Sequence, residues 1–354
     1  MSEVYSVSTL DERNEYGDEE QNLFRPVMNE YAVLKRLIKQ KGLLEKQPKY
    51  YMYKILSSLG LLCVGIVFLL LVSTFWLQLV DAVFLAFACG QVAFVCHDGG
   101  HRQIFNATRK NDLLFLLQGP ILLGMSDAWW LDTHNAHHSH PNELDMDPDI
   151  SIPALCYLEE EARSRRGLWS FLVKYQAFFF FPFTLLVSIE FQRSSIFYLL
   201  KHRVKYYWAE VGLLLLHYVL YFWLVFSLLH LWQGIVFILV HQAFLGLYLG
   251  ATFAPNHKGM PILEKNTSLD FLRRQVLTAR NVTSHPIVDF CYAGLNYQVE
   301  HHLFPSMPRN NLKEAQRIIK AYCEQHSIVY YETTVVQSYR EILSFLHLVG
   351  ASLR

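Results

Sequence analysis

Two long stretches of the chain are almost free of charged side chains. Between Ile55 and Cys96 the only Asp, Glu, Lys or Arg is Asp81, and between Val211 and Pro255 there is none. A helix that crosses a bilayer needs roughly 20 mainly apolar residues, so each stretch is long enough to cross twice. Polar residues interrupt both stretches near the middle. The pattern predicts four membrane-spanning helices, paired as two hairpins, near residues 55–75 with 78–97 and 209–229 with 233–254. The alternative, a pair of long buried core helices in a soluble protein, is disfavoured because few soluble folds bury two such runs.

The basic residues indicate how these helices are oriented. Lys and Arg avoid both hairpins and gather before the first hairpin and between the two. Because cytoplasmic loops carry an excess of Lys and Arg, we expect both termini and the central region to be cytoplasmic. The expected fold is an all-α integral membrane protein with a cytosolic helical cap built from residues 98–208 and 255–354. It would lie in the cell membrane of a bacterium or the endoplasmic reticulum of a eukaryote.

Residues 1–30 differ from the rest of the chain. They are acidic and contain no apolar core, so they are not a signal peptide. We expect a mobile tail there, followed by one domain over residues 31–354.

Two weaker apolar stretches are not expected to cross the membrane. Leu113 to Met125 is too short and contains Gly119-Pro120, which predicts an interfacial or re-entrant segment. Residues 169–200 are Phe-rich but interrupted by charged residues and Pro182, which predicts amphipathic helices on the membrane surface. A fifth span at 169–200 is the alternative, and it would invert the second hairpin and separate the histidine clusters described below.

The composition agrees with a membrane protein. Hydrophobic residues make up 52% of the chain and charged residues only 18%, against roughly 25% charged in soluble domains. The net charge of zero disfavours nucleic acid as a partner, because phosphate binding needs an excess of Lys and Arg. The 6 cysteines form no Cys-x-x-Cys pair, so neither a disulfide framework nor a zinc ribbon is expected.

Histidine is the unusual residue, with 16 copies, many in short clusters. Spacings of three and four place side chains on one face of a helix, and the clusters have these spacings. Gly99-Gly100 makes a helical first cluster less favourable, unless the glycines allow a close backbone approach. The clusters are His97 with His101; His134 with His137 and His138; and His301 with His302, preceded by Gln298; His257 is a fourth candidate.

Several neutral imidazoles in one place are good ligands for first-row transition metals. A structural zinc ion would need four ligands, usually including thiolates, so this number of histidines indicates two metals. The expected hairpins bring all the clusters to the cytosolic side. The chain lacks both Glu-x-x-His and His-Glu-x-x-His. What remains is an imidazole-rich dimetal site at a membrane surface.

The clusters and the residues around them resemble the membrane fatty acid desaturases over roughly residues 31–330. The flanking matches are Trp129-Trp130, Pro141-Asn142, Asp147-Pro148-Asp149, Arg280-Asn281, residues 295–305 and Met307-Pro308-Arg309. Gln298 at the head of the third cluster resembles the front-end branch, which inserts a double bond between an existing one and the carboxyl end. No His-Pro-Gly-Gly haem motif of a cytochrome b5 domain is present. The resemblance therefore implies a separate electron donor, a cytochrome b5 or a ferredoxin with its reductase.

The resemblance also implies a cofactor and site residues. Two irons would use O2 to remove two hydrogens from a fatty acyl chain carried on CoA or on a lipid. The implied metal ligands are His97, His101, His134, His137, His138, His257, His301 and His302. His257 lies outside the three clusters, and binding a lipid headgroup is the alternative role for it. His140 does not have the spacing that the clusters share, so it is not assigned as a ligand.

Further residues are assigned roles around the metals. Gln298 should face the metal pair without binding it and hold a water there, while Asp98 and Asp149 are candidates to orient the ligand histidines. A helix cap or a solvated turn is the alternative for both aspartates. The candidates to line an acyl tunnel are Trp129, Trp130, Tyr292 and Tyr297, for which interfacial anchoring is the alternative.

Two other functions use the same residues. A lipid hydroxylase on this scaffold would add one oxygen instead of removing two hydrogens. A membrane metal transporter or sensor would place ionisable residues inside the spans along a pathway, whereas the clusters here lie outside them.

Overall fold

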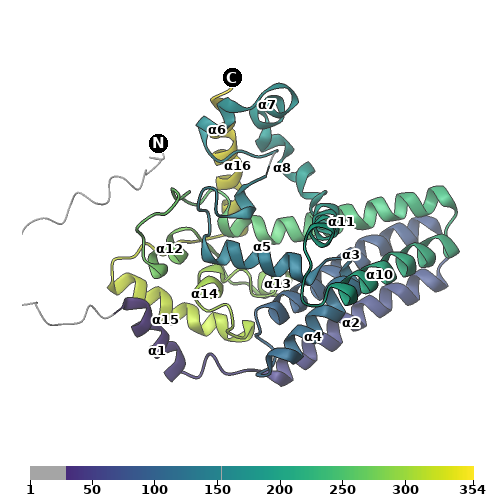
Figure 1. Cartoon of the computed structure of the whole chain (residues 1–354), viewed down its shortest axis with the longest axis horizontal. Helices are drawn as coiled ribbons and strands as arrows, with labels where there is room; N and C mark the ends of the chain where they lie inside the picture. The colour runs from purple at the N-terminus through teal and green to yellow at the C-terminus, as the bar shows by residue number, and fades with distance from the viewer. Residues whose placement is uncertain (1–28, 153) are drawn as a thin grey trace, which may run out of the picture.

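The computed structural model describes residues 29–152 and 154–354, and these form α-helices with one small sheet (Figure 1). The acidic segment expected at 1–30 therefore lies outside the described residues, except for Asn29 and Glu30. The first half of the described chain contains α1 (Glu30–Gln40), α2 (Pro48–Leu71), α3 (Phe75–Gly100), α4 (Thr108–Gln118), the π-helix η2 (Gly119–Leu123), α5 (Asp127–Ser139), the 3-10 helix η3 (Pro148–Ile150), α6 (Glu159–Ser164), α7 (Gly167–Lys174) and α8 (Gln176–Thr184). The second half contains α9 (Val187–Lys201), α10 (Tyr207–Leu228), α11 (Leu231–His257), α12 (Phe271–Leu277), β1 (Asn281–Val282), α13 (Pro286–Cys291), α14 (Gln298–Leu303), the 3-10 helix η4 (Arg309–Asn311), α15 (Leu312–Gln325), β2 (Glu332–Thr333) and α16 (Val335–Ala351).

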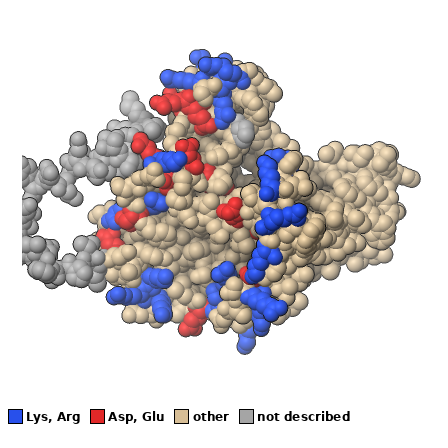
Figure 2. Space-filling view, viewed as in Figure 1, with Lys and Arg blue, Asp and Glu red and all other residues tan. Residues whose placement is uncertain are grey.

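Four helices, α2, α3, α10 and α11, are long and apolar enough to cross a membrane. They extend together to one side of the molecule, and their far end carries no charged residue in the view of Figure 2. α3 is the central one: 67% of its most apolar 18-residue segment is buried inside the protein, against 17% of the corresponding segments of α2 and α10. It packs against both α2 and α11.

Two glycines allow close packing around α11. A Cβ atom at Gly90 of α3 would overlap the Tyr248 ring of α11, so only glycine lets that ring lie against α3. A Cβ at Gly246 would lie 2.7 Å from the carbonyl oxygen of Leu185, which holds α11 close to the end of α8. α11, which ends at His257, is therefore packed closely against both α3 and the end of α8.

The two weaker apolar stretches form short helices. α4 and η2 are joined to α5 with a bend of 108°, which makes this segment either a broken span or a re-entrant loop. Residues 169–200 form most of α7, α8 and α9, and none of these three helices meets the length and hydropathy of a span. α9 packs against α5 and α11.

The C-terminal third surrounds the short helix α14. One hydrophobic core, which includes Leu303, Met307 and Ile319, joins α14 to α1, α12 and α15. The parallel pair β1–β2, in register Asn281 with Glu332 and Val282 with Thr333, ties the segment before α14 to the segment before α16. α14 is thereby held on several sides, and its histidines face the ends of α3, α5 and α11.

Candidate metal centre

The first histidine cluster lies in the last turn of α3. Helix α3 continues through Gly99 and Gly100, and His101 follows as its C-cap. A Cβ at Gly100 would overlap the Trp130 ring of α5, so this glycine serves a close approach instead of ending the helix. Trp130 in turn stacks on His134, with ring centroids 4.2 Å apart.

The second cluster lies on α5, which begins with Ser126 as its N-cap. The Ser126 hydroxyl donates a hydrogen bond of 2.5 Å to Glu210, which ties the start of α5 to α10. His134, His137 and His138 follow within the last two turns of α5. The contact with α10 therefore helps to fix the helix that carries these histidines.

The third cluster lies on α14, and His257 ends α11. His301 and His302 are each 1% exposed, and His257 is 6% exposed. The eight histidines implied by the resemblance meet in one place, although they come from four different helices. His140 is not among them, since its Nδ1 pairs with Glu143 at 2.9 Å.

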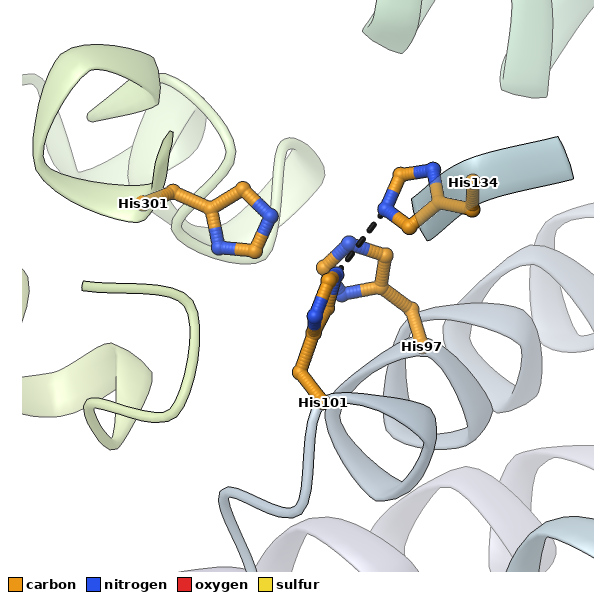
Figure 3. Close-up of side chains that lie close together, drawn as sticks. All are labelled: His97, His101, His134 and His301. Atoms are coloured by element: carbon orange, nitrogen blue, oxygen red, sulfur yellow. Dashed lines mark hydrogen bonds between the residues drawn. The ribbon is translucent and has the colours of Figure 1, made fainter. Parts of the chain in front are cut away.

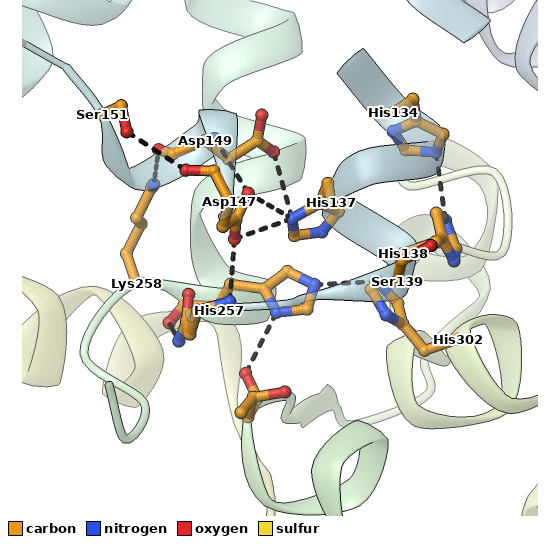
Figure 4. Close-up of polar contacts among 12 residues, drawn as sticks. His134, His137, His138, Ser139, Asp147, Asp149, Ser151, His257, Lys258 and His302 are labelled. Atoms are coloured by element: carbon orange, nitrogen blue, oxygen red, sulfur yellow. Dashed lines mark hydrogen bonds and ion pairs between the residues drawn. The ribbon is translucent and has the colours of Figure 1, made fainter. Parts of the chain in front are cut away.

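The eight imidazoles form two groups with one histidine between them. His97, His101, His134 and His301 each present a nitrogen within 4.8 Å of the others (Figure 3). His137, His257 and His302 form a second group within the same limit (Figure 4). The ring of His138 lies 4.6 Å from that of His101 and 4.2 Å from that of His302, so it lies between the groups.

The second group is held in one orientation by acceptors outside the cluster. His137 Nδ1 lies 3.0 Å from Asp147, His257 Nδ1 3.0 Å from the Thr278 carbonyl, and His302 Nδ1 2.8 Å from Gln275 Oε1. These oxygens can only accept, so each Nδ1 must carry the proton. Nε2 of His137 and of His302 is then left with a lone pair, as a metal ligand requires, while the Nε2 lone pair of His257 faces the amide nitrogen of Gln298.

The cluster fits metal ions better than it fits a hydrogen-bonded core. Burial, aided by neighbouring imidazoles, holds the pKa of both His301 and His302 well below the usual 6.5, so both are neutral. Within the described part of the chain, His138 Nδ1 and His301 Nε2 are buried without a hydrogen-bond partner. Buried nitrogens of native proteins rarely lack a partner, and a bound cation would provide one. The all-imidazole donor set suits first-row transition metals.

The carboxylates near the histidines are only partly those expected. Asp98 Oδ1 lies 3.3 Å from His97 Nδ1, but its other oxygen pairs with Arg309 Nε at 2.5 Å. Asp149 lies 3.6 Å from His137, beyond a hydrogen bond, whereas both oxygens of Asp147 lie at 3.0 Å. Asp147 therefore holds His137 more closely than Asp149 does. The sequence prediction named Asp149 and not Asp147.

Gln298 lies beside the second group. Its Oε1 accepts a hydrogen bond of 3.0 Å from Asn256, so its amide nitrogen faces inward, 2.8 Å from His257 Nε2. Two residues after Gln298, Glu300 is fully buried and accepts hydrogen bonds from Asn281 and Tyr330 at 2.6 and 2.8 Å. Burial raises the pKa of Glu300 to about 7, although these hydrogen bonds act in the opposite direction.

The four aromatic candidates occupy different places. Trp130 packs on the first group, while Trp129 packs on Phe191 of α9, with centroids 5.3 Å apart. Tyr297 precedes α14 and its hydroxyl lies 3.2 Å from Asp289. Tyr292 is buried at the end of α13. Trp130 thus contacts the histidine cluster directly.

Comparisons with known proteins agree with this geometry. The chain is 27% identical over 334 residues to an acyl-lipid (9-3)-desaturase of Physcomitrium patens, and this match covers 90% of the chain and 62% of the relative. It is 26% identical to a Δ6 fatty acid desaturase of Caenorhabditis elegans and 29% identical to a Δ8 fatty acid desaturase of Arabidopsis thaliana; each match covers 86% of this chain and 71% of the relative. The chain thus spans between three fifths and three quarters of these relatives' length. The family model for fatty acid desaturases matches residues 37–334, and the chain belongs to this family.

Proposed function

We propose that this chain introduces a cis double bond into a fatty acyl chain carried on CoA or on a lipid, with two iron ions and O2. The observation that carries the proposal is the convergence of eight histidines from four helices into two groups. Curated relatives named as fatty acid desaturases support it. Because the relatives include Δ6 and Δ8 enzymes, and Gln298 heads the third cluster, we assign the chain to the front-end type.

Each histidine group would hold one iron. His97, His101, His134 and His301 would bind the first ion, and His137, His257 and His302 the second, with His138 available to either. When bound, the iron pair supplies the O2 reduction and hydrogen removal that no side chain can perform.

The surrounding residues orient the ligands and exclude water. Asp147, Gln275 and the Thr278 carbonyl fix which nitrogen of the second group faces inward. The Trp130 ring covers His134, and we propose that it forms the wall between the metals and the acyl chain. Trp129, Tyr292 and Tyr297 would extend that wall farther from the metals.

The reaction needs an external supply of electrons. Forming one double bond removes two hydrogens, whereas reducing O2 to two waters takes four electrons and four protons. Two electrons and two protons must therefore come from elsewhere. We propose a separate cytochrome b5 or ferredoxin, with its reductase, as the donor.

The membrane topology is also a proposal. We infer that α2 with α3 and α10 with α11 form two hairpins, and that the histidine centre and both termini are cytoplasmic. Lys49 and Lys54 are the basic residues within the four helices, and both lie at the start of α2. Tyr51, between them, donates a hydrogen bond to Gln103, just after the histidine end of α3. This distribution of positive charge supports a cytoplasmic position for that end.

The reaction type can be tested by the mass of the product. We expect a host with a simple fatty-acid profile that expresses the chain to accumulate acyl chains lighter by two hydrogens, detected by mass spectrometry of the lipids. A matched culture with His301→Ala should accumulate none, because the substitution removes one of the four histidines of the first group. An acyl product heavier by one oxygen would identify a hydroxylase and contradict the proposal.

Metal content gives an independent test. The purified protein should contain about two irons per chain, measured by elemental analysis. His137→Ala should lose iron and at least about 100-fold in activity, while the protein still inserts into membranes. His140→Ala is the matched control from the same helix end and should keep both irons. One tightly bound zinc per chain would refute the assignment.

The electron requirement can be tested with purified components. The 354-residue chain should be inactive with NAD(P)H and O2 alone, and adding a cytochrome b5 or a ferredoxin with its reductase should restore turnover. The readout is O2 consumption coupled to product formation. Full activity without any added redox protein would exclude a separate donor.

Gln298 should act beside the metals without holding one. Because its amide nitrogen faces the second group, we expect Gln298→Ala to retain most of the iron and to lose about 10–100-fold in activity. Gln298→His should keep some activity, because the position already faces imidazoles. Iron loss in Gln298→Ala equal to that in His301→Ala would show that the glutamine is a ligand, and unchanged turnover would remove it from the mechanism.

A further inference from the structure

A cavity of about 370 Å³ lies along α2, between this helix and Gln91 and Val95 of α3. Its polar end contains Lys54 and Arg309, and its opposite end contains Leu61 and Val64 of α2. Phe290 of α13 lies on the remaining side, 48% exposed. The cavity therefore joins two cations to an apolar helix face.

Arg309, which lines this cavity, has a donor without an acceptor. The residue is 6% exposed; its Nε donates to Asp98, and its Nη1 donates to the Ala293 carbonyl at 3.2 Å. Among residues 29–152 and 154–354, nothing accepts a hydrogen bond from Nη2, which is buried. A buried guanidinium nitrogen without an acceptor is costly, so an acceptor supplied by a ligand would stabilise it.

The cavity has an excess of positive charge. Asp98 balances the charge of Arg309, but no carboxylate lines the cavity to balance Lys54. The Lys54 ammonium lies 5.6–5.8 Å from the ring centroids of Tyr50, Tyr53 and Phe290. A ligand with a negative group would balance the charge of Lys54 and would offer an acceptor to Arg309.

The apolar end indicates what is attached to that negative group. Lys54 is the last charged residue before the uncharged run of α2. A Cβ at Gly60 would meet no atom within 4 Å, and Val64 is 60% exposed. Hydrocarbon chains beside α2 could enter this open space from the bilayer, with their polar head at the depth of Lys54.

From these observations we infer that the cavity binds one membrane phospholipid, whose phosphate contacts Lys54 and Arg309 and whose acyl chains lie along Gly60 and Val64. A phosphate offers several acceptor oxygens, enough for an ammonium and a guanidinium at once. The inference concerns binding and does not depend on desaturation. Arg309 also pairs with Asp98, and Asp98 contacts the proposed metal ligand His97. The lipid phosphate would therefore be linked to His97 through Arg309 and Asp98.

The test measures binding of a soluble phospholipid to the full-length protein in detergent. We expect dioctanoyl phosphatidic acid to bind with one site per chain by isothermal titration calorimetry, and dioctanoylglycerol, which lacks the phosphate, to bind at least about tenfold more weakly. Lys54→Gln should weaken phosphatidic acid binding by a similar factor, and Lys54→Arg should restore it. Arg309 is not substituted, because its loss would leave Asp98 unpaired beside His97.

A matched pair of glycine variants tests the location. Gly60→Phe should abolish binding by filling the cavity, whereas Gly212→Phe should leave it unchanged, because a Cβ at Gly212 of α10 also meets no atom within 4 Å. Both variants should remain monodisperse. Equal binding of dioctanoylglycerol, or wild-type affinity in Gly60→Phe, would overturn the inference. Displacement of phosphatidic acid by an equimolar amount of decanoate would instead assign the cavity to a fatty acid carboxylate.

Discussion

The fixed direction of the imidazole rings is the constraint on which the rest of the site depends. A neutral imidazole can bind a metal through only one nitrogen, and the proton on the other nitrogen must be donated somewhere. In the second group the Nδ1–H bonds go to Asp147, Thr278 and Gln275. These acceptors come from two segments, the start of η3 and α12 with its C-cap Thr278, so the orientation of the second group depends on how both segments pack against it.

Helix ends bring these segments together. His97 and His257 lie in the last turns of α3 and α11, and glycines let these helices pack closely against each other and against α8. α5 is tied to α10 through Ser126 and Glu210, and α14 is enclosed by α1, α12 and α15. The apolar helices thus act as a rigid support, while short helices outside them contribute five of the eight histidines: His134, His137, His138, His301 and His302.

The sequence indicated the helices and the ligands because both have strong local signals. Uncharged runs predicted four long apolar helices, and spacings of three and four identified the histidines. Acceptors such as Gln275 and the Thr278 carbonyl have no such signal, because they are defined only by contacts across the fold. The choice between Asp147 and Asp149 likewise depends on a turn, in which Asp147 also accepts from the backbone N–H groups of Asn142 and Asp149. The sequence left open whether Gly99-Gly100 disfavours a helix or allows a close approach; Gly100 is helical, and the Trp130 ring lies where its Cβ would be.

The central claim is that the two imidazole groups hold two separate metal ions. Anomalous X-ray diffraction from crystals of the iron-loaded protein, collected on both sides of the iron absorption edge, tests it most directly. The account predicts two iron peaks, one enclosed by His97, His101, His134 and His301 and the other by His137, His257 and His302. A single peak, or a peak outside these groups, would contradict it.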